Sequence, residues 1–251
     1  MPSSYGAVSG VYDRYTKNVD YKRYSKLIAK TLKENNIEGI VLDAGCGTGT
    51  MTLLLAKLGF DMIGADVSEE MLAIASEKAF LAKAEIPFLR QELTKLDLYG
   101  TVKVVVSTLD TLNHLESKAK LKATISRFSL FTEAEGLLIF DMNTPYKHKN
   151  VLADNAFVFD DGEIMLVWQN EYDEKKRRVK ITTDVFSPED DGLYARESDE
   201  FFEYDYEIKE VEELLSECGY ALLSKADFDT LLPPTEKTER VLFIAKKVVE
   251  A

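Results

Sequence analysis

The stretch Val41-Leu42-Asp43-Ala44-Gly45-Cys46-Gly47-Thr48-Gly49-Thr50 decides the fold, because a short apolar strand here runs into a glycine-rich turn. The segment that follows, from Met51 to Leu58, is apolar and favours a helix, so the predicted order is strand, turn, helix. Glycines let such a turn bend sharply and let a ligand approach the backbone, while the first turn of the helix offers unpaired N–H groups. The stretch therefore predicts a ligand-binding loop at the carboxyl end of a strand.

This order of strand and helix repeats along the first 143 residues. An amphipathic helix is predicted over 18–35, and further strands are predicted over 61–66, 86–91, 102–106 and 136–141. Segments with helical periodicity separate several of these strands. Such alternation is typical of a parallel sheet covered by helices on both faces, so the sequence predicts an α/β fold.

After Asn143 the pattern changes to strand-like segments rich in Phe, Val, Trp and Tyr. Asp160-Asp161-Gly162 and Asp190-Asp191-Gly192 are typical of hairpin turns. Four antiparallel strands are therefore predicted, over 156–159, 164–172, 179–186 and 193–206. A helix over 207–218 and strands over 220–228 and 240–246 return to the first pattern, so we expect the β segment to be an insertion in one α/β domain.

Composition excludes some functions without choosing one. The chain has 251 residues, with 31 basic and 44 acidic side chains and a formal net charge of −13, which disfavours binding to nucleic acid or to an anionic membrane surface. No apolar stretch approaches the roughly 20 residues of a membrane span, and no signal-like start is present. Two cysteines, Cys46 and Cys218, are too few for a metal quartet and suit a reducing compartment. We expect a cytoplasmic protein with no metal, either a monomer or a homodimer.

Three kinds of glycine-rich site share the strand, turn, helix design. A phosphate-binding P-loop needs a final Gly-Lys followed by Ser or Thr, but the fifth position after Gly45 is Thr50, followed by Met51, which excludes it. A dinucleotide site needs Gly-x-Gly-x-x-Gly, whose third glycine also falls on Thr50, which weakens that interpretation. What remains is Asp-x-Gly-x-Gly-x-Gly, with a second acid, Asp66, at the end of the next strand.

These residues resemble the nucleoside-binding signature of class I S-adenosylmethionine-dependent methyltransferases. The resemblance continues through three further segments, 66–72, 91–93 and 104–107, so that it spans residues 38–141. It extends to a bacterial group of small-molecule methyltransferases near the glycine N-methyltransferase-like branch, on the segments Tyr12-Asp13, 109–115, 140–143 and 168–170. The resemblance implies a Rossmann-like, seven-stranded and mostly parallel sheet with helices on both faces, an antiparallel final strand and an antiparallel β insertion over the mouth of the site.

On this resemblance one methyltransferase domain is expected over 1–251. It would comprise an N-terminal helical cap (1–36), a cofactor-binding core (37–143), a β insertion or lid (144–206) and a C-terminal segment that completes the core sheet (207–251).

The cofactor implied is S-adenosyl-L-methionine, and its contacts follow from the motifs. Asp66 at a strand end suits a bidentate contact with both ribose hydroxyls. By resemblance, Asp43 orders the loop and lies near the ammonium group. The other cofactor-binding residues expected are Gly45, Gly47 and Gly49 against the amino-acid part, Val67, Met71, Glu92 and Leu93 around adenine, and Leu109. Of the N-terminal tyrosines Tyr5, Tyr12, Tyr15 and Tyr24, which either cover the cofactor or simply pack, Tyr12 and Tyr24 are the candidates.

Candidate acceptor residues follow the fourth and fifth strands. Because ligands collect at the carboxyl ends of strands in open α/β sheets, Asp110, Asn113, His114, Asp141 and Asn143 are expected to converge there. His114 is either a general base or a hydrogen-bonded structural group, while Asp141 and Asn143 would orient the acceptor.

The other histidine, His148, follows a Pro-Tyr turn and is expected at the surface. A thiol nucleophile at Cys46 lacks a partner base in the sequence.

The sequence thus predicts an enzyme that transfers a methyl group in line to a small-molecule acceptor. Two alternatives stay open: a protein that binds S-adenosylmethionine without transferase activity or uses a modified cofactor, and a nicotinamide oxidoreductase.

Overall fold

The computed structural model describes residues 6–248, and its core is a seven-stranded sheet with the order β10-β11-β5-β4-β1-β2-β3. Strands β1 to β5 pair in parallel, whereas β11 runs antiparallel to both β5 and β10. The predicted Rossmann-like sheet with an antiparallel final strand is therefore confirmed. The bounds are β1 Ile40–Ala44, β2 Asp61–Asp66, β3 Phe88–Arg90, β4 Val102–Ser107, β5 Thr132–Asn143, β10 Tyr220–Asp227 and β11 Arg240–Lys247.

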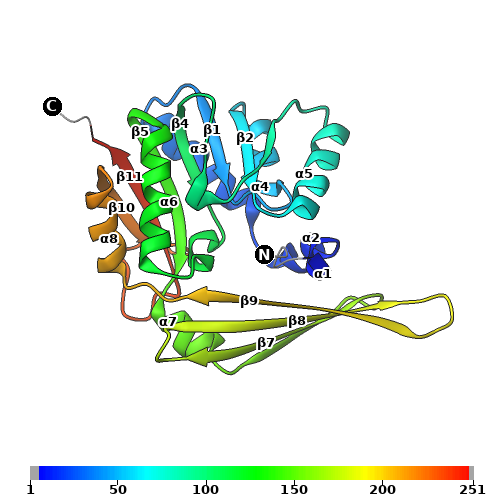
Figure 1. The fold of residues 1–251 in the computed structure, drawn as a ribbon. Coiled ribbons are helices and arrows are strands. Elements are labelled where there is room, and N and C mark those ends of the chain that lie inside the picture. Colours follow the sequence, from blue (N-terminus) through cyan, green and yellow to red (C-terminus); the bar gives the residue numbers. More distant parts are fainter. Residues whose placement is uncertain (1–5, 249–251) are drawn as a thin grey trace.

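Helices cover both faces of this sheet, as the alternation predicts (Figure 1). Side chains of a strand point alternately to its two faces, so Leu42 and Val41 of β1 enter different cores. Leu42 packs in the core to which α6 and α8 contribute, and Val41 packs in the core to which α3 and α4 contribute. The bounds are α3 Tyr21–Glu34, α4 Thr50–Lys57, α5 Glu69–Leu81, α6 Lys118–Phe131 and α8 Ile208–Glu217.

The insertion between β5 and α8 contains a second sheet, antiparallel, with the order β6-β7-β8-β9. Its bounds are β6 Ala156–Asp160, β7 Met165–Asp173, β8 Arg178–Pro188 and β9 Tyr194–Tyr204, close to the predicted strands. Figure 1 shows the long strands β7 to β9 crossing the end of the core at which the strands β1, β2 and β4 terminate. The antiparallel β insertion predicted from the change of pattern is confirmed.

The N-terminal segment lies between this insertion and the core (Figure 1). It contains α1 Gly6–Ser9, α2 Tyr12–Tyr15 and the short helix η1 Thr16–Asn18. Val8 and Val11 are buried in one cluster with Leu166 and Val185 of the insertion sheet. The Arg14 side chain adds ion pairs with the carboxylates of Asp161 and Glu163. The segment is therefore packed onto the insertion sheet.

Short helices complete the chain: η2 Leu93–Lys95, η3 Thr111–His114, α7 Pro145–Lys147 and η4 His148–Leu152. Within residues 6–248, no helix has both the length and the apolar character that crossing a membrane requires.

The antiparallel strand β11 is joined to the parallel part of the sheet by a buried aromatic pair. The rings of Phe140 on β5 and Phe243 on β11 stack with their centroids 4.9 Å apart, and both side chains are almost fully buried. We expect Phe243→Ala to lower the free energy of unfolding by about 3–5 kcal/mol, since it removes this stack and leaves a cavity. Urea denaturation measures the change.

The matched control is Leu223→Ala on the neighbouring strand β10, where the side chain is 49% exposed. This variant should lower the free energy of unfolding by less than about 1 kcal/mol. Equal losses in the two variants would show that the Phe140–Phe243 stack contributes nothing particular to this joint.

Candidate active site

A cavity of about 1030 Å³ opens where β1, β2 and β4 end. This is the size of pocket in which small-molecule ligands and cofactors bind, roughly 300–1,000 Å³. Most of the predicted cofactor residues line it, together with residues of the N-terminal segment and of η3. The lining includes Tyr12, Tyr21, Asp43, Gly45, Cys46, Gly47, Asp66, Val67, Met71, Glu92, Leu93, Leu109, Thr111 and His114.

The glycine-rich loop is pressed against η3 on one side of this cavity. Gly45 has a φ of +78°, and a Cβ atom there would lie 2.2 Å from Thr111 Cγ2. Its N–H and that of Cys46 donate to the carbonyl of Ala65, at 2.7 and 3.0 Å. Gly49, in contrast, does not line the cavity; it precedes α4 with a φ of +72° and packs against Ala75 and Phe88. Only glycine permits both backbone positions.

Asp66 joins the glycine loop to the end of β2. Its Oδ2 accepts a hydrogen bond from the Gly47 N–H and its Oδ1 one from the Ser68 N–H, both at 2.9 Å. Burial raises the pKa of this carboxyl, although the two backbone donors favour its ionised form. The carboxylate is thus fixed in the cavity wall with lone pairs left for a ligand.

Asp43, the last but one residue of β1, lies in the same wall. It is fully buried, and its Oδ2 accepts a hydrogen bond of 2.6 Å from Thr52 Oγ. Burial raises the pKa of Asp43 to about 6, and the nearby Asp66 carboxylate acts in the same direction. A bound cation would favour the ionised form. The neighbouring Cys46 thiol is held neutral, because burial raises its pKa far above the usual range.

The residues predicted to surround adenine lie together along another part of the lining. Val67 is 56% exposed, Met71 is buried, and Glu92 and Leu93 follow β3. The Glu92 carboxylate accepts from Thr94 Oγ and from Lys95 Nζ, and these hydrogen bonds lower its pKa. An apolar slot beside an ionised acceptor suits a nucleobase.

Only one of the two N-terminal tyrosines predicted to contact the cofactor lies at the cavity. Tyr12 lines the cavity, but Tyr24 does not: its ring lies against Phe228, with centroids 4.1 Å apart, and its hydroxyl faces Asp229. Instead, Tyr21, one turn earlier on α3, lines the cavity. Both belong to the apolar stripe of this helix, so spacing alone could not distinguish them. Tyr15 packs on Phe159, and Tyr5 lies outside the described residues.

Of the three candidate catalytic residues, the structure brings one to the cavity. His114 lines it, and the ring Nδ1 lies 3.1 Å from the carbonyl oxygen of Phe202 on β9. Asp141 is fully buried and accepts hydrogen bonds from the N–H groups of Leu109 and Asp110, at 2.8 and 2.9 Å.

Asn143 and Asn113 are also buried and lie outside the lining. The Asn143 amide donates to Glu203 Oε2 at 2.7 Å, and the Asn113 amide donates to the carbonyl of Tyr204 at 2.9 Å. They therefore join β5 and η3 to the end of β9. Their contacts, like those of Asp141, hold elements together behind the cavity, and an acceptor-orienting role for Asp141 and Asn143 stays a prediction.

Sequence reasoning missed three charged or titratable groups beside His114. Glu203 on β9 is buried, and His148 Nε2 lies 3.0 Å from its Oε2. The expectation that His148 lies at the surface is wrong: the helix η4 carries it under the insertion, where it is fully buried. The third is Arg240, which begins β11 and contacts Asp110 and Asp141. These partners lie 55–130 residues apart in the sequence, and no local pattern pairs them.

Comparison with known proteins decides the family. A family model described as a methyltransferase domain matches residues 41–134. A protein of Geobacillus sp. (strain WCH70) named "Putative methyltransferase" is 35% identical over 239 residues, covering 94% of this chain and 96% of that protein. The chain belongs to the S-adenosylmethionine-dependent methyltransferases.

Two further similarities agree with this assignment. The crystal structure of an S-adenosylmethionine-dependent methyltransferase from Clostridium acetobutylicum ATCC 824 has a TM-score of 0.88 at 27% identity, covering 98% of this chain and 99% of that one. The glycine/sarcosine N-methyltransferase of Halorhodospira halochloris is 28% identical over 143 residues, about half of each chain. The protein is thus a methyltransferase enzyme whose cofactor is S-adenosylmethionine.

The cavity of this methyltransferase fits that cofactor. Its wall presents the fixed carboxylate of Asp66, the carboxyl group of Asp43 and, at Gly45 and Gly47, backbone without side chains, which are groups that suit a ribose diol and a cationic ligand. The contacts of these residues with the cofactor stay a prediction.

Replacement of the strand-end acid tests the ribose contact. We expect Asp66→Ala to weaken S-adenosylmethionine binding about 100-fold, because it removes a half-buried, hydrogen-bonded carboxylate from the cavity wall. Calorimetric titration measures the affinity. Asp61→Ala is the control, since Asp61 is exposed at the opposite end of the same strand. Unchanged affinity in Asp66→Ala would refute the ribose role.

The raised pKa of Asp43 predicts a pH dependence. Above pH 6 this carboxyl is ionised and attracts the cationic cofactor, and below pH 6 it becomes neutral. The dissociation constant should therefore increase about tenfold between pH 7 and pH 5, with proton uptake by the free protein. Calorimetric titrations with S-adenosylmethionine between pH 7 and pH 5 measure this change in the dissociation constant. Asp43→Asn should bind more weakly at pH 7 and show a flatter profile; an equally steep profile in the variant would assign the dependence to another group.

Proposed function

We propose that this methyltransferase transfers the methyl group in line to a small-molecule acceptor. The observation that carries the proposal is the cavity between the core and the N-terminal segment. Asp13, beside Tyr12, accepts hydrogen bonds from Thr48 Oγ at 2.7 Å and from Lys78 Nζ at 2.7 Å. These bonds fasten the N-terminal segment onto the glycine loop and α5. An acceptor has to fit beneath this segment, which favours a small molecule.

The lining separates into a cofactor part and an acceptor part. Asp43, the glycine loop, Asp66 and the residues around Met71 and Glu92 are assigned to the cofactor. When bound, the cofactor supplies an electrophilic methyl group on a sulfonium centre. Tyr12 and Leu109 stay with the predicted cofactor residues, and Tyr21, Thr111 and His114, which also line the cavity, are then left for the acceptor. Two fixed subsites side by side align the reacting atoms, which accounts for a large part of the acceleration in a displacement of this kind.

His114 is the residue we assign as general base. A carbonyl oxygen only accepts hydrogen bonds, so the contact with Phe202 O places the hydrogen of a neutral ring on Nδ1. Nε2 is then the atom that takes up a proton from the acceptor.

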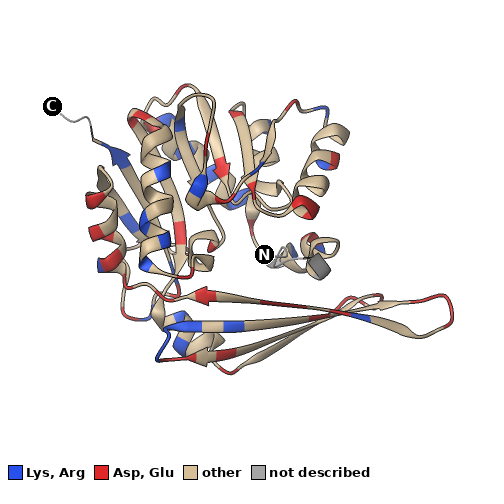
Figure 2. Cartoon of the chain, in the orientation of Figure 1, with Lys and Arg blue, Asp and Glu red and all other residues tan. Residues whose placement is uncertain are grey.

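Charge supports a small acceptor over a nucleic acid. The net charge is −13, and Figure 2 shows acidic positions along α8 and around the β8–β9 hairpin, with basic positions scattered over several elements. Phosphate backbones bind to clustered basic side chains. The named acceptors of the glycine/sarcosine N-methyltransferase relative are small molecules too. The unpaired thiols of Cys46 and Cys218 support a cytoplasmic location.

The test is incubation of the protein with methyl-labelled S-adenosylmethionine and a cell extract, followed by separation of small molecules, nucleic acid and protein. We expect the label in the small-molecule fraction. Label confined to protein or nucleic acid would overturn the proposal. The Asp66→Ala variant is the control, because it should lose transfer together with cofactor binding.

The base role of His114 has its own test. We expect His114→Gln to slow methyl transfer at pH 7.5 by about 100-fold, the lower end of the usual contribution of a general base. Its dissociation constant for S-adenosylmethionine should stay within about twofold of that of the unmodified protein, since His114 lies outside the cofactor part of the lining. If the His114→Gln variant has unaltered turnover across the pH range, His114 is not the general base.

A further inference from the structure

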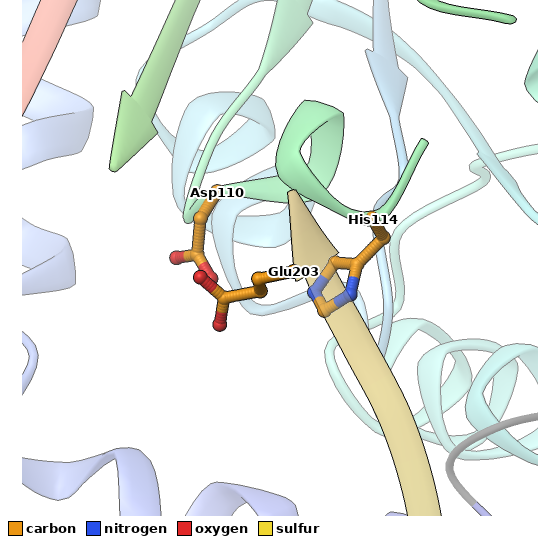
Figure 3. A group of neighbouring side chains, drawn as sticks. All are labelled: Asp110, His114 and Glu203. Carbon is orange, nitrogen blue, oxygen red and sulfur yellow. The ribbon is translucent and has the colours of Figure 1, made fainter. Parts of the chain in front are cut away.

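Three side chains beside the cavity form an acidic recess that the cofactor does not need. Asp110 precedes η3, His114 ends it, and Glu203 comes from β9 of the insertion. One carboxylate oxygen of each acid and one ring nitrogen of His114 lie within 4.8 Å of one another. Figure 3 shows the two carboxylates turned toward each other, with the imidazole beside Glu203. His114 connects the recess to the cavity, because its ring also lines the cavity.

Both acids keep one oxygen without a hydrogen bond in the described part of the chain. Glu203 is 2% exposed, and its Oε2 accepts from Asn143 Nδ2 and His148 Nε2, whereas Oε1 has no hydrogen-bond partner. Burial is the largest single influence and favours the neutral acid, but the hydrogen bonds from His148 and Asn143 and the two nearby imidazoles together outweigh it, so the pKa of Glu203 is lowered. Asp110 Oδ1 accepts from Arg240 Nη2 at 2.7 Å, and its Oδ2 has no partner. One acceptor oxygen of each acid is therefore left for a ligand.

The surrounding charges do not neutralise these acids. The guanidinium of Arg240 is shared, since it also donates to Asp141 Oδ1 at 3.1 Å. Lys147 Nζ donates to Asn143 at 3.0 Å, but burial and the proximity of Arg240 lower its pKa. The three carboxylates of Asp110, Asp141 and Glu203 thus outnumber the two cationic side chains nearby, Arg240 and Lys147. Close carboxylates repel each other unless a proton or a cation lies between them.

We propose that the recess of Asp110, His114 and Glu203 binds the protonated nitrogen of the acceptor, so that the substrate class is an amine. This inference rests on the proposed function and deepens it. The ammonium group donates hydrogen bonds to the two carboxylates and loses one proton to His114 Nε2. The nitrogen lone pair then forms a bond to the methyl carbon while the carbon–sulfur bond breaks, and sulfur keeps that electron pair. The products are the methylated ammonium, S-adenosylhomocysteine and one released proton.

The charges beside the recess favour an ammonium group over a divalent metal ion. Arg240 already occupies one oxygen of Asp110 at 2.7 Å, and its positive charge opposes a second, doubly charged ion. The candidate ligand atoms of the three residues lie within 4.8 Å of one another, which is compatible with the hydrogen bonds of about 2.8 Å that an ammonium group donates.

The first experiment asks which chemical group receives the methyl. The extract is acetylated to block its amines, then treated with hydroxylamine to restore esterified hydroxyls, and offered to the protein with methyl-labelled S-adenosylmethionine beside a mock-treated extract. We expect transfer to small molecules to fall at least about tenfold in the blocked extract. Equal transfer in both extracts would overturn the amine assignment while leaving the proposed function intact.

The second experiment assigns the recess residues. Glu203→Gln and Asp110→Asn preserve the shape of the side chains but remove one charge each, and both should raise the KM for the amine fraction at least about tenfold. Their dissociation constants for S-adenosylmethionine should not change. The matched control is Glu200→Gln on the same strand, whose carboxylate pairs with Lys180 at 3.0 Å. A KM that stays the same in both recess variants, with thermal unfolding also unchanged, would refute the assignment.

The third experiment tests whether a metal ion binds in the recess. Transfer should be the same in EDTA and after addition of Mg²⁺ or Mn²⁺. Loss of transfer in EDTA that Mg²⁺ or Mn²⁺ restores would place a metal ion in the recess and overturn the amine proposal.

Discussion

The buried carboxylate of Asp141 is the constraint on which the site depends. It accepts hydrogen bonds from two successive backbone N–H groups, those of Leu109 and Asp110, and from the Arg240 guanidinium. Leu109 and Asp110 both have positive φ values, 57° and 55°, which non-glycine residues adopt only where the surroundings hold them. The hydrogen bonds to Asp141 therefore stabilise an otherwise unfavourable backbone turn after β4. That turn brings Thr111 against Gly45 and His114 to the cavity.

The same buried contacts explain why the antiparallel elements matter for a site built on parallel strands. Arg240 is the first residue of β11, so the last strand of the chain supplies the cation that Asp110 and Asp141 share. Glu203 near the end of β9 faces Asp110 and His114 across the boundary between the core and the insertion. The Asn113 amide ties the two together through the carbonyls of Asn143 and Tyr204. The insertion thus contributes Glu203 to the recess.

Most of the fold could be predicted from the sequence, because its determinants are local. Apolar periodicity places α3 and the strands, and Gly162 and Gly192, both with positive φ, mark the hairpins of the insertion. Most residues of the cavity wall at the ends of β1 and β2 could be predicted too, since they lie within a few positions of strand ends in a fixed order. The recess could not be predicted from the sequence. Glu203 and Arg240 are 93 and 130 residues from Asp110 in the chain, and neither belongs to a sequence motif. Tyr21 and Tyr24 show the same limit within one helix: both suit its apolar stripe, and only the packing of Tyr24 on Phe228 distinguishes them.

Three aspartates at the carboxyl ends of core strands illustrate why position alone does not give a role. Asp43, Asp66 and Asp141 all lie at or near such an end, yet only the first two line the cavity. Asp66 keeps lone pairs for a ligand because two backbone donors use only part of its capacity. Asp141 has its capacity taken up by two backbone donors and a guanidinium, and it is fully buried. The difference lies in Arg240, which an antiparallel strand adds beside β5 and which β1 and β2 lack as a neighbour. The residues on the adjacent strand therefore decide whether a strand-end acid faces a ligand or supports the loop that does.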